Sequence, residues 1–226
     1  VSPRTTQALF PLGSALIPSW PRLRRVWAFA CVSLALYGQL LGGGGGVGTT
    51  IDGIAFPGEL SGQAFVGGGT RSKYGAVKVY AVGLYIDAAR ATSSLKPFVG
   101  VPAAKLPTGF FKTLQTGKFG KTLLLQFHRS VASETVAGAM RDSLASRLGA
   151  ATLDKFREAL LAALASSSVA KGDRIYFACR GDAMTISAGK LGGGQSVRDR
   201  TVCPAFLDVY VGAKPISPAA KAGIAA

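Results

Sequence analysis

The sequence has few of the side chains on which metal sites and much catalysis depend. Among 226 residues there are one histidine, His128, and three cysteines, Cys31, Cys179 and Cys203, without a CxxC pair. Neither a zinc site nor a disulfide framework is predicted, and Cys179 and Cys203 are expected to be small buried apolar residues. His128 has no Ser, Cys or Asp motif beside it, so a structural or surface role is expected.

Two glycine-rich segments lack the other residues of a nucleotide site. GGGGGVG at 42–48 and GGGT at 67–70 have no GKS or GKT ending. Neither has the strand and the acidic partner that a dinucleotide fold requires. We therefore expect no metal, no cofactor and no catalytic residue of these classes.

Acidic residues are scarce, with 11 against 26 basic ones and a net charge of +15. The first acid is Asp52, and four arginines precede it, so the rest of the chain has 22 basic and 11 acidic residues spread over many segments. No basic and aromatic motif accompanies this charge, so we expect no nucleic-acid partner. A surface that attracts anionic lipid or an anionic ligand fits the charge at least as well.

The first 46 residues are predicted to be a targeting leader and a linker. Residues 1–25 contain Ser, Thr, Pro and Arg and no acid, and the apolar run Val26–Leu41 follows, closed by Gly42–Gly46. This composition is typical of an organelle transit peptide. The apolar run would extend about 24 Å as a helix, less than the ~30 Å hydrocarbon core. It is either part of a cleaved leader or a short retained anchor that associates with a membrane, and the folded domain is predicted at 47–226.

Apolar segments punctuated by glycine predict strands on both sides of a helical region. Hydrophobic residues make up 48% of the chain and charged residues 16%, which excludes a disordered protein. The strongest strand pattern is Ala76–Asp87, with both faces partly covered. The other predicted strands are Ile51–Phe56, Gln63–Gly67, Thr122–His128, Arg174–Cys179 and Met184–Ala188, the last two paired across the turn Arg180–Asp182.

Apolar residues at helical spacing predict two long helices between these strands. One covers Ser133–Leu148 with Ser133 as its N-cap, and the other covers Thr152–Ala165 with Thr152 as its cap. A short helix at Pro204–Val211 is expected to end at Gly212. Strands, then helices, then strands predict an α+β domain in which helices cover one face of an antiparallel sheet.

The segment 67–85, GGGTRSKYGAVKVYAVGLY, carries the main candidate site. A glycine-rich turn is expected to place Arg71 just before a strand, and alternation directs Tyr80 away from the face of Val79 and Ala81. An arginine fork and a phenol hydroxyl that meet at one cavity form a carboxylate site. The alternative is a surface arginine and a half-buried tyrosine of a sheet.

Six features follow one another along the domain: Gly69–Arg71, Val77–Tyr85, Phe119 with Lys121, the helix pair 133–165, Lys171–Asp173 and Leu207–Lys221. In their order and spacing they resemble the chalcone isomerase superfamily, in particular its fatty-acid-binding branch, over about 175 residues. The resemblance implies an open-faced antiparallel β-sheet with a layer of helices on one face and a ligand cleft between them. It also implies that Arg71 and Tyr80 hold a fatty-acid carboxylate. The expected location is an organelle, the plastid stroma rather than the mitochondrion.

The chain departs from the isomerases of this family at four polar positions. The resemblance places Tyr80 where they use a threonine, Thr135 and Asp142 where they have Tyr and Asn, and Val209 where they have Thr. Together with Lys121, the last three are expected near the cleft. We therefore predict a non-catalytic protein that binds a fatty acid or another small apolar carboxylate. The alternatives are an intramolecular lyase of the chalcone–flavanone isomerase type and a membrane-tethered structural protein with an empty cleft.

Overall fold

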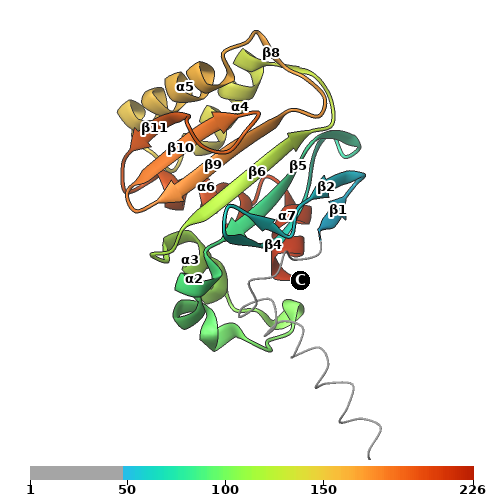
Figure 1. Ribbon diagram of the computed structural model, residues 1–226, viewed down its shortest axis with the longest axis vertical. Helices are drawn as coiled ribbons and strands as arrows, with labels where there is room; N and C mark the ends of the chain where they lie inside the picture. Colours follow the sequence, from blue (N-terminus) through green and yellow to red (C-terminus); the bar gives the residue numbers. More distant parts are fainter. Residues whose placement is uncertain (1–47) are drawn as a thin grey trace, which may run out of the picture. The chain divides into compact units, whose positions relative to one another are not determined.

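The computed structural model describes residues 48–226, and the predicted leader at 1–46 with its apolar run lies outside this part of the chain. The main sheet has seven antiparallel strands in the order β11-β10-β9-β6-β5-β4-β3 (Figure 1). The strands are β3 (Glu59–Leu60), β4 (Gln63–Lys73), β5 (Val77–Ile86), β6 (Lys121–Phe127), β9 (Arg174–Arg180), β10 (Ala183–Ala188) and β11 (Gln195–Arg198). Two short antiparallel pairs accompany it, β1 (Thr49–Ile51) with β2 (Ile54–Phe56), and β7 (Val131–Ala132) with β8 (Ser168–Val169).

The helices lie in three segments of the chain, between β5 and β6, between β6 and β9, and after β11. Between β5 and β6 lie α2 (Ala88–Leu95), two 3₁₀ turns (Lys96–Phe98 and Ala103–Lys105) and α3 (Thr108–Thr116). Between β6 and β9 lie α4 (Ser133–Leu144) and α5 (Ala150–Leu164), and the chain ends with α6 (Val202–Val211) and α7 (Pro218–Ala225). Among residues 48–226, no helix has the length and hydrophobicity needed to cross a bilayer.

The two faces of the sheet bury different sets of side chains. Tyr80, Val82 and Leu84 of β5 belong to the large cluster under the helices, where the rings of Phe177 in β9 and Phe206 in α6 lie 4.3 Å apart. Ala81 and Tyr85 of β5 belong to a smaller cluster on the opposite face. The β1–β2 hairpin covers this face and contributes Phe56 to the cluster. The predicted α+β architecture, with helices on one face of an antiparallel sheet, is confirmed.

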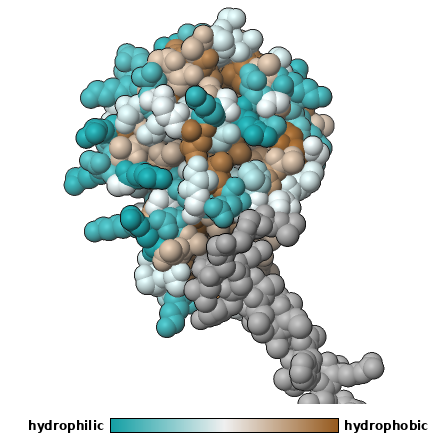
Figure 2. Space-filling view, viewed as in Figure 1, coloured by the Kyte–Doolittle hydropathy of each residue, from teal (hydrophilic) through white to brown (hydrophobic). Residues whose placement is uncertain are grey.

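Hydrophilic side chains surround an area of hydrophobic surface near the centre of the face seen in Figure 2. Some exposed apolar atoms are normal for a folded domain, because its polar side chains are too few to cover the whole surface. Burial of apolar side chains stabilises the fold, and 42 hydrophobic residues of the described part are buried.

The predicted strand pairing near the C-terminal half is confirmed, and several predicted helix ends are wrong. Met184 of β10 lies opposite Cys179 of β9, as expected. Ser133 is not an N-cap, because it is the first residue of α4 and its hydroxyl oxygen is buried without a partner. Thr152 is not a cap either, because α5 begins at Ala150 and the Thr152 hydroxyl donates to Asp199. The predicted helix Ser133–Leu148 ends at Leu144.

The expectation that the two described cysteines are unlinked apolar residues is also wrong. Cys179 in β9 and Cys203 in the first turn of α6 form a disulfide, and their Cα atoms are 5.9 Å apart. Both side chains are buried. The two cysteines are 24 residues apart and match no sequence pattern that predicts a disulfide. Their sulfurs meet because α6 packs against the sheet in the tertiary structure.

The glycines at 67–69 lie in strand β4 and allow α7 to approach its backbone closely. A Cβ on Gly69 would lie 2.4 Å from the carbonyl carbon of Ala219, and a Cβ on Gly223 would lie 1.9 Å from the oxygen of Gly68. The hydroxyl of Ser217 donates to the carbonyl of Thr70 and fixes the start of α7 on the strand. A predicted glycine-rich turn is therefore a strand whose missing side chains make room for a helix.

We expect Gly69→Val to destabilise the protein by about 1 to 3 kcal/mol, because the added side chain must push α7 away from β4. Gly138 in α4 is the matched control, since a Cβ there meets no atom within 4 Å. Gly138→Ala is expected to stabilise the helix by about 0.5 to 1 kcal/mol. Urea unfolding of both variants measures these changes, and an unchanged midpoint for Gly69→Val would contradict the close approach.

Candidate ligand pocket

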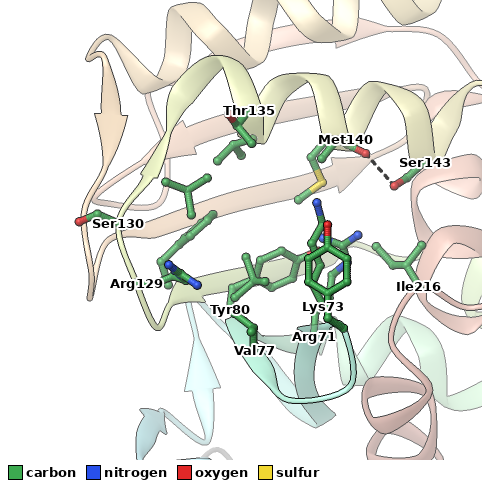
Figure 3. A pocket seen from close by; sticks show the side chains of 16 residues that line it. Arg71, Lys73, Val77, Tyr80, Arg129, Ser130, Thr135, Met140, Ser143 and Ile216 are labelled. Atoms are coloured by element: carbon green, nitrogen blue, oxygen red, sulfur yellow. Dashed lines mark hydrogen bonds between the residues drawn. The ribbon is translucent and has the colours of Figure 1, made fainter.

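A cavity of about 300 Å³ lies between the β4–β5 hairpin and helix α4 (Figure 3). This volume is at the lower end of the range of small-molecule sites. Most of its wall is apolar, and its polar groups come from the tip of the β4–β5 hairpin, the segment after β6 and helix α4. The lining residues are Arg71, Lys73, Tyr74, Val77, Val79, Tyr80, Phe127, Arg129, Ser130, Val131, Thr135, Val136, Ala139, Met140, Ser143 and Ile216.

Arg71 and Tyr80 lie directly opposite each other on neighbouring antiparallel strands, β4 and β5. Paired residues of this kind project to the same face of a sheet. The guanidinium carbon of Arg71 is 5.8 Å from the centre of the Tyr80 ring, and both residues line the cavity. The two side chains therefore lie at one wall of the cavity. The strand position of Arg71 corrects the predicted turn, because β4 continues to Lys73.

A second tyrosine, which the sequence reasoning missed, supports the first. The hydroxyls of Tyr80 and Tyr210 are 2.9 Å apart and form a buried hydrogen bond. Burial raises the pKa of Tyr80, against the opposing charge of Arg71, and burial also raises the pKa of Tyr210 well above its ordinary value. Both phenols therefore keep their protons. If Tyr210 donates to the Tyr80 oxygen, the proton of Tyr80 is free to be donated to a ligand.

A sequence signal for Tyr210 does exist. All residues of α6 except Pro204 and Asp208 are buried, so the helix is apolar around most of its circumference. A buried tyrosine usually needs a hydrogen-bond partner for its hydroxyl. The apolar pattern of 202–211 therefore predicts that Tyr210 contacts another polar group in the core.

The charge around the cavity is positive, and no acidic side chain among residues 48–226 lines it. Arg71, Lys73 and Arg129 line the cavity, and none of its described lining residues carries a carboxylate. The Nε atom of Arg71 is buried and has no hydrogen-bond partner among the described residues. A buried donor of this kind is costly to leave unpaired. The cavity thus presents an unsatisfied cationic donor beside a neutral phenol, which suits an anionic acceptor.

A break in the strand register turns additional apolar residues toward the cavity. Arg71 pairs with Tyr80, but Ser72 pairs with Lys78, so Val79 is an extra residue in β5. Such a bulge interrupts the alternation of side chains between the two faces. Val77 and Val79 consequently line the same cavity as Tyr80, where strict alternation predicted the opposite face.

Of the other residues expected near the cleft, only Thr135 lines the cavity. Asp142 lies on α4 but is exposed and absent from the wall, so its charge does not oppose an anionic ligand there. Val209 is fully buried in the core beside Tyr210 in α6. The predicted cleft positions of Asp142 and Val209 are therefore wrong, because Asp142 is exposed to solvent and Val209 is packed in the core under α6, away from the cavity.

Lys121 lies at the opposite end of the sheet from the cavity. It begins β6, whereas the cavity contains Phe127 at the end of that strand. Its amino group donates to the carbonyl of Gly117 and lies 4.4 Å from the centre of the Phe119 ring. Burial lowers the pKa of Lys121 to about 8. Lys121 is a buried structural cation and not part of the candidate site.

We expect Lys121→Met to stabilise the protein at pH 7, with a gain that declines as the pH rises from about 8 toward 10.5. An unfolded lysine has a pKa near 10.4, so below pH 8 both states are protonated and the folded wild type bears the full cost of the buried charge. Above pH 8 the folded state loses the proton first, and this cost is relieved.

Urea unfolding between pH 6.5 and pH 10 measures this dependence. The exposed neighbour Lys118, changed to Met, removes the same charge and is expected to show no such trend. A gain for Lys121→Met that is constant across the range would contradict the buried cation.

The comparisons with known proteins identify the family and the fold of the chain. No family model matches the chain. A chalcone–flavanone isomerase of Hordeum vulgare is 30% identical over 202 residues, which cover 77% of this chain and 86% of that protein. A chalcone–flavanone isomerase of Zea mays is 27% identical over 194 residues, with coverage of 76% and 82%. The chain belongs to the chalcone isomerase family.

A solved structure shows the same fold. The crystal structure of a fatty-acid binding protein of Arabidopsis thaliana superposes with a TM-score of 0.65 at 20% sequence identity. The superposition covers 79% of this chain and 96% of that protein. The described part of the chain therefore has the chalcone isomerase-like fold.

Proposed function

We propose that this protein binds a fatty acid without converting it, with the carboxylate at Arg71 and Tyr80 and the acyl tail in the apolar part of the cavity. The observation that carries the proposal is the buried, unpartnered Nε of Arg71 beside the neutral hydroxyl of Tyr80. A carboxylate accepts two parallel bonds from a guanidinium fork and a third bond from a phenol. The structural similarity to a fatty-acid binding protein of Arabidopsis thaliana supports the same ligand class.

The apolar wall supplies most of the binding free energy, and the polar pair sets the orientation. Each methylene group that leaves water contributes about 0.8 kcal/mol, so a tail of about ten carbons outweighs the head group. Met140 and Ile216 lie opposite and beside Tyr80 in Figure 3, and Val136 also lines the cavity, so such a tail would contact these side chains. The hydrogen bonds to the charged head group contribute on the order of 1.5 to 3 kcal/mol each.

The lining residues favour binding over catalysis. The described wall of the cavity contains no carboxylate, imidazole or thiol, so its hydroxyl side chains, Ser130, Thr135 and Ser143, have no carboxylate or imidazole base beside them to activate them. The phenols of Tyr80 and Tyr210 have raised pKa values and are bonded to each other, which makes them poor proton acceptors at neutral pH. A group that holds its proton is suited to donating a hydrogen bond to a bound anion.

We expect Arg71→Ala to weaken binding of a saturated fatty acid by about 10- to 100-fold, because the charged hydrogen bonds of the fork are lost. Arg198→Ala is the matched control, since Arg198 is exposed on the edge strand β11 and its loss changes the net charge equally. Isothermal titration calorimetry of the full chain measures both affinities.

The head group can be tested from the ligand side in the same experiment. A fatty alcohol of the same chain length is expected to bind the wild type about as weakly as the fatty acid binds Arg71→Ala. Equal affinities of Arg71→Ala and the wild type for the acid would remove the proposal.

A second candidate function is the intramolecular lyase reaction of a chalcone–flavanone isomerase, which the two curated relatives favour by their names. That reaction asks hydrogen-bond donors to stabilise charge that develops on a bicyclic transition state. In this chain the buried Tyr80 stands where the family resemblance places a threonine in the isomerases. The larger phenol ring fills space that the chalcone would need.

We expect the purified protein to leave the rate of chalcone ring closure within about twofold of the buffer rate, because Tyr80 narrows the cavity and its hydroxyl is bonded to Tyr210. The decrease of chalcone absorbance at neutral pH measures the rate. A large acceleration that Arg71→Ala abolishes would favour the lyase over the fatty-acid carrier.

A further inference from the structure

The tip of the β4–β5 hairpin, residues 73–78, places exposed apolar side chains at the entrance of the cavity. Tyr74 is 93% exposed and Val77 is 38% exposed, and both line the cavity. In the described part of the chain, only one other large hydrophobic residue, Val99, is comparably exposed, and it lies in the segment between α2 and α3. The apolar surface that is most available to a partner is therefore concentrated at this entrance.

The backbone of the tip holds Tyr74 outward at a cost. Tyr74 has a φ of 52° and Gly75 a φ of 77°, so both residues are in the left-handed region. Glycine and asparagine adopt this conformation readily, whereas a bulky residue there is strained. Neither local backbone preference nor burial explains a tyrosine at this position. An external contact that uses the ring would explain it.

Cationic side chains surround the exposed ring. Lys73 lies beside Tyr74 and Arg129 lies across the cavity, and neither forms an ion pair with any residue of 48–226. Lys78 follows Val77 and bonds Asp52 at 2.8 Å. The cavity wall itself contains no acid. The entrance thus combines an aromatic ring, an aliphatic side chain and uncompensated positive charge, with a cavity for an amphiphile behind them.

We propose that this hairpin tip docks the cavity entrance onto an anionic lipid bilayer. Tyr74 and Val77 enter the headgroup region, where tyrosine rings are favoured, and Lys73 and Arg129 contact lipid phosphates. The docked entrance then faces the source of the ligand, so a fatty acid can pass between the bilayer and the cavity without crossing bulk water. The ligand-transfer part of this proposal rests on the proposed fatty-acid binding, and the docking part does not.

Hydrogen exchange of the full chain with phospholipid vesicles tests the docking. Vesicles of 30% phosphatidylserine in phosphatidylcholine are expected to slow exchange at least several-fold in peptides covering residues 70–80, and pure phosphatidylcholine is expected to have a much smaller effect. Because the readout is local, binding through residues 26–41 alone would leave these peptides unchanged, and that result would overturn the proposal. Protection of the tip that grows with protein concentration without vesicles would assign it to a second copy of the chain and also overturn it.

Tyr74→Asn separates the role of the ring from the stability of the fold, because asparagine suits the left-handed backbone. With a fluorescent long-chain fatty acid bound at saturation, we expect this variant to transfer the ligand to anionic vesicles at least threefold more slowly than the wild type, with a much smaller difference for pure phosphatidylcholine vesicles. Val99→Asn, which removes a comparably exposed side chain elsewhere, is expected to transfer it at the wild-type rate. Equal rates for Tyr74→Asn and the wild type would contradict the proposal. If the wild type did not bind the fatty acid, the proposed function would fail while the exchange experiment still tested the docking.

Discussion

The account depends on a guanidinium and a phenol that one antiparallel strand pair holds side by side at a cavity wall. Arg71 and Tyr80 are register partners, so their convergence follows from the backbone and does not require flexible loops. A buried donor such as Arg71 Nε without an acceptor is unfavourable for the folded protein, and a bound anion would relieve this cost. The Arg71 Nε that lowers the stability of the unliganded protein is thus the atom that would donate to a carboxylate.

Two C-terminal helices keep this pair in place from different sides. Helix α6 supplies the Tyr210 hydroxyl to Tyr80, and the disulfide between Cys203 and Cys179 ties its first turn to β9. Helix α7 packs on the glycines of β4, and Ser217 at its start bonds the carbonyl of Thr70, the residue next to Arg71. The glycine-rich segment therefore permits close packing of α7 on the strand that carries the arginine, on the face to which Arg71 and Tyr80 project.

The sequence predicted the arrangement of β5, where local periodicity and tertiary structure agree. The alternation of Tyr80, Val82 and Leu84 predicted that these residues share one face of the strand, and the family resemblance indicated Arg71 as the partner of Tyr80. The predicted turn before Arg71 was wrong, because glycine usually indicates a turn and the helix that requires these glycines lies about 150 residues later in the chain. The disulfide was not predicted for the same reason, since its two cysteines are close only in the tertiary structure.

The position of α4 over the sheet explains the remaining differences at the site. Thr135 lines the cavity, whereas Asp142 lies seven residues, about two turns, further along nearly the same side of α4 and is exposed and absent from the wall, which is completed by Ala139, Met140 and Ser143. The packing of α4 against α5 and α6 decides which part of the helix borders the cavity, and no local sequence pattern records this packing. The bulge at Val79 likewise depends on pairing with β4 and is not visible in β5 alone.

A crystal structure of the protein grown with a saturated medium-chain fatty acid tests the central claim most directly. The account predicts electron density for the ligand in the cavity between β5 and α4, with its carboxylate within hydrogen-bonding distance of the Arg71 guanidinium and the Tyr80 hydroxyl, and its tail against Val136 and Met140. A carboxylate bound elsewhere, or a cavity that stays empty at saturating ligand, would contradict it.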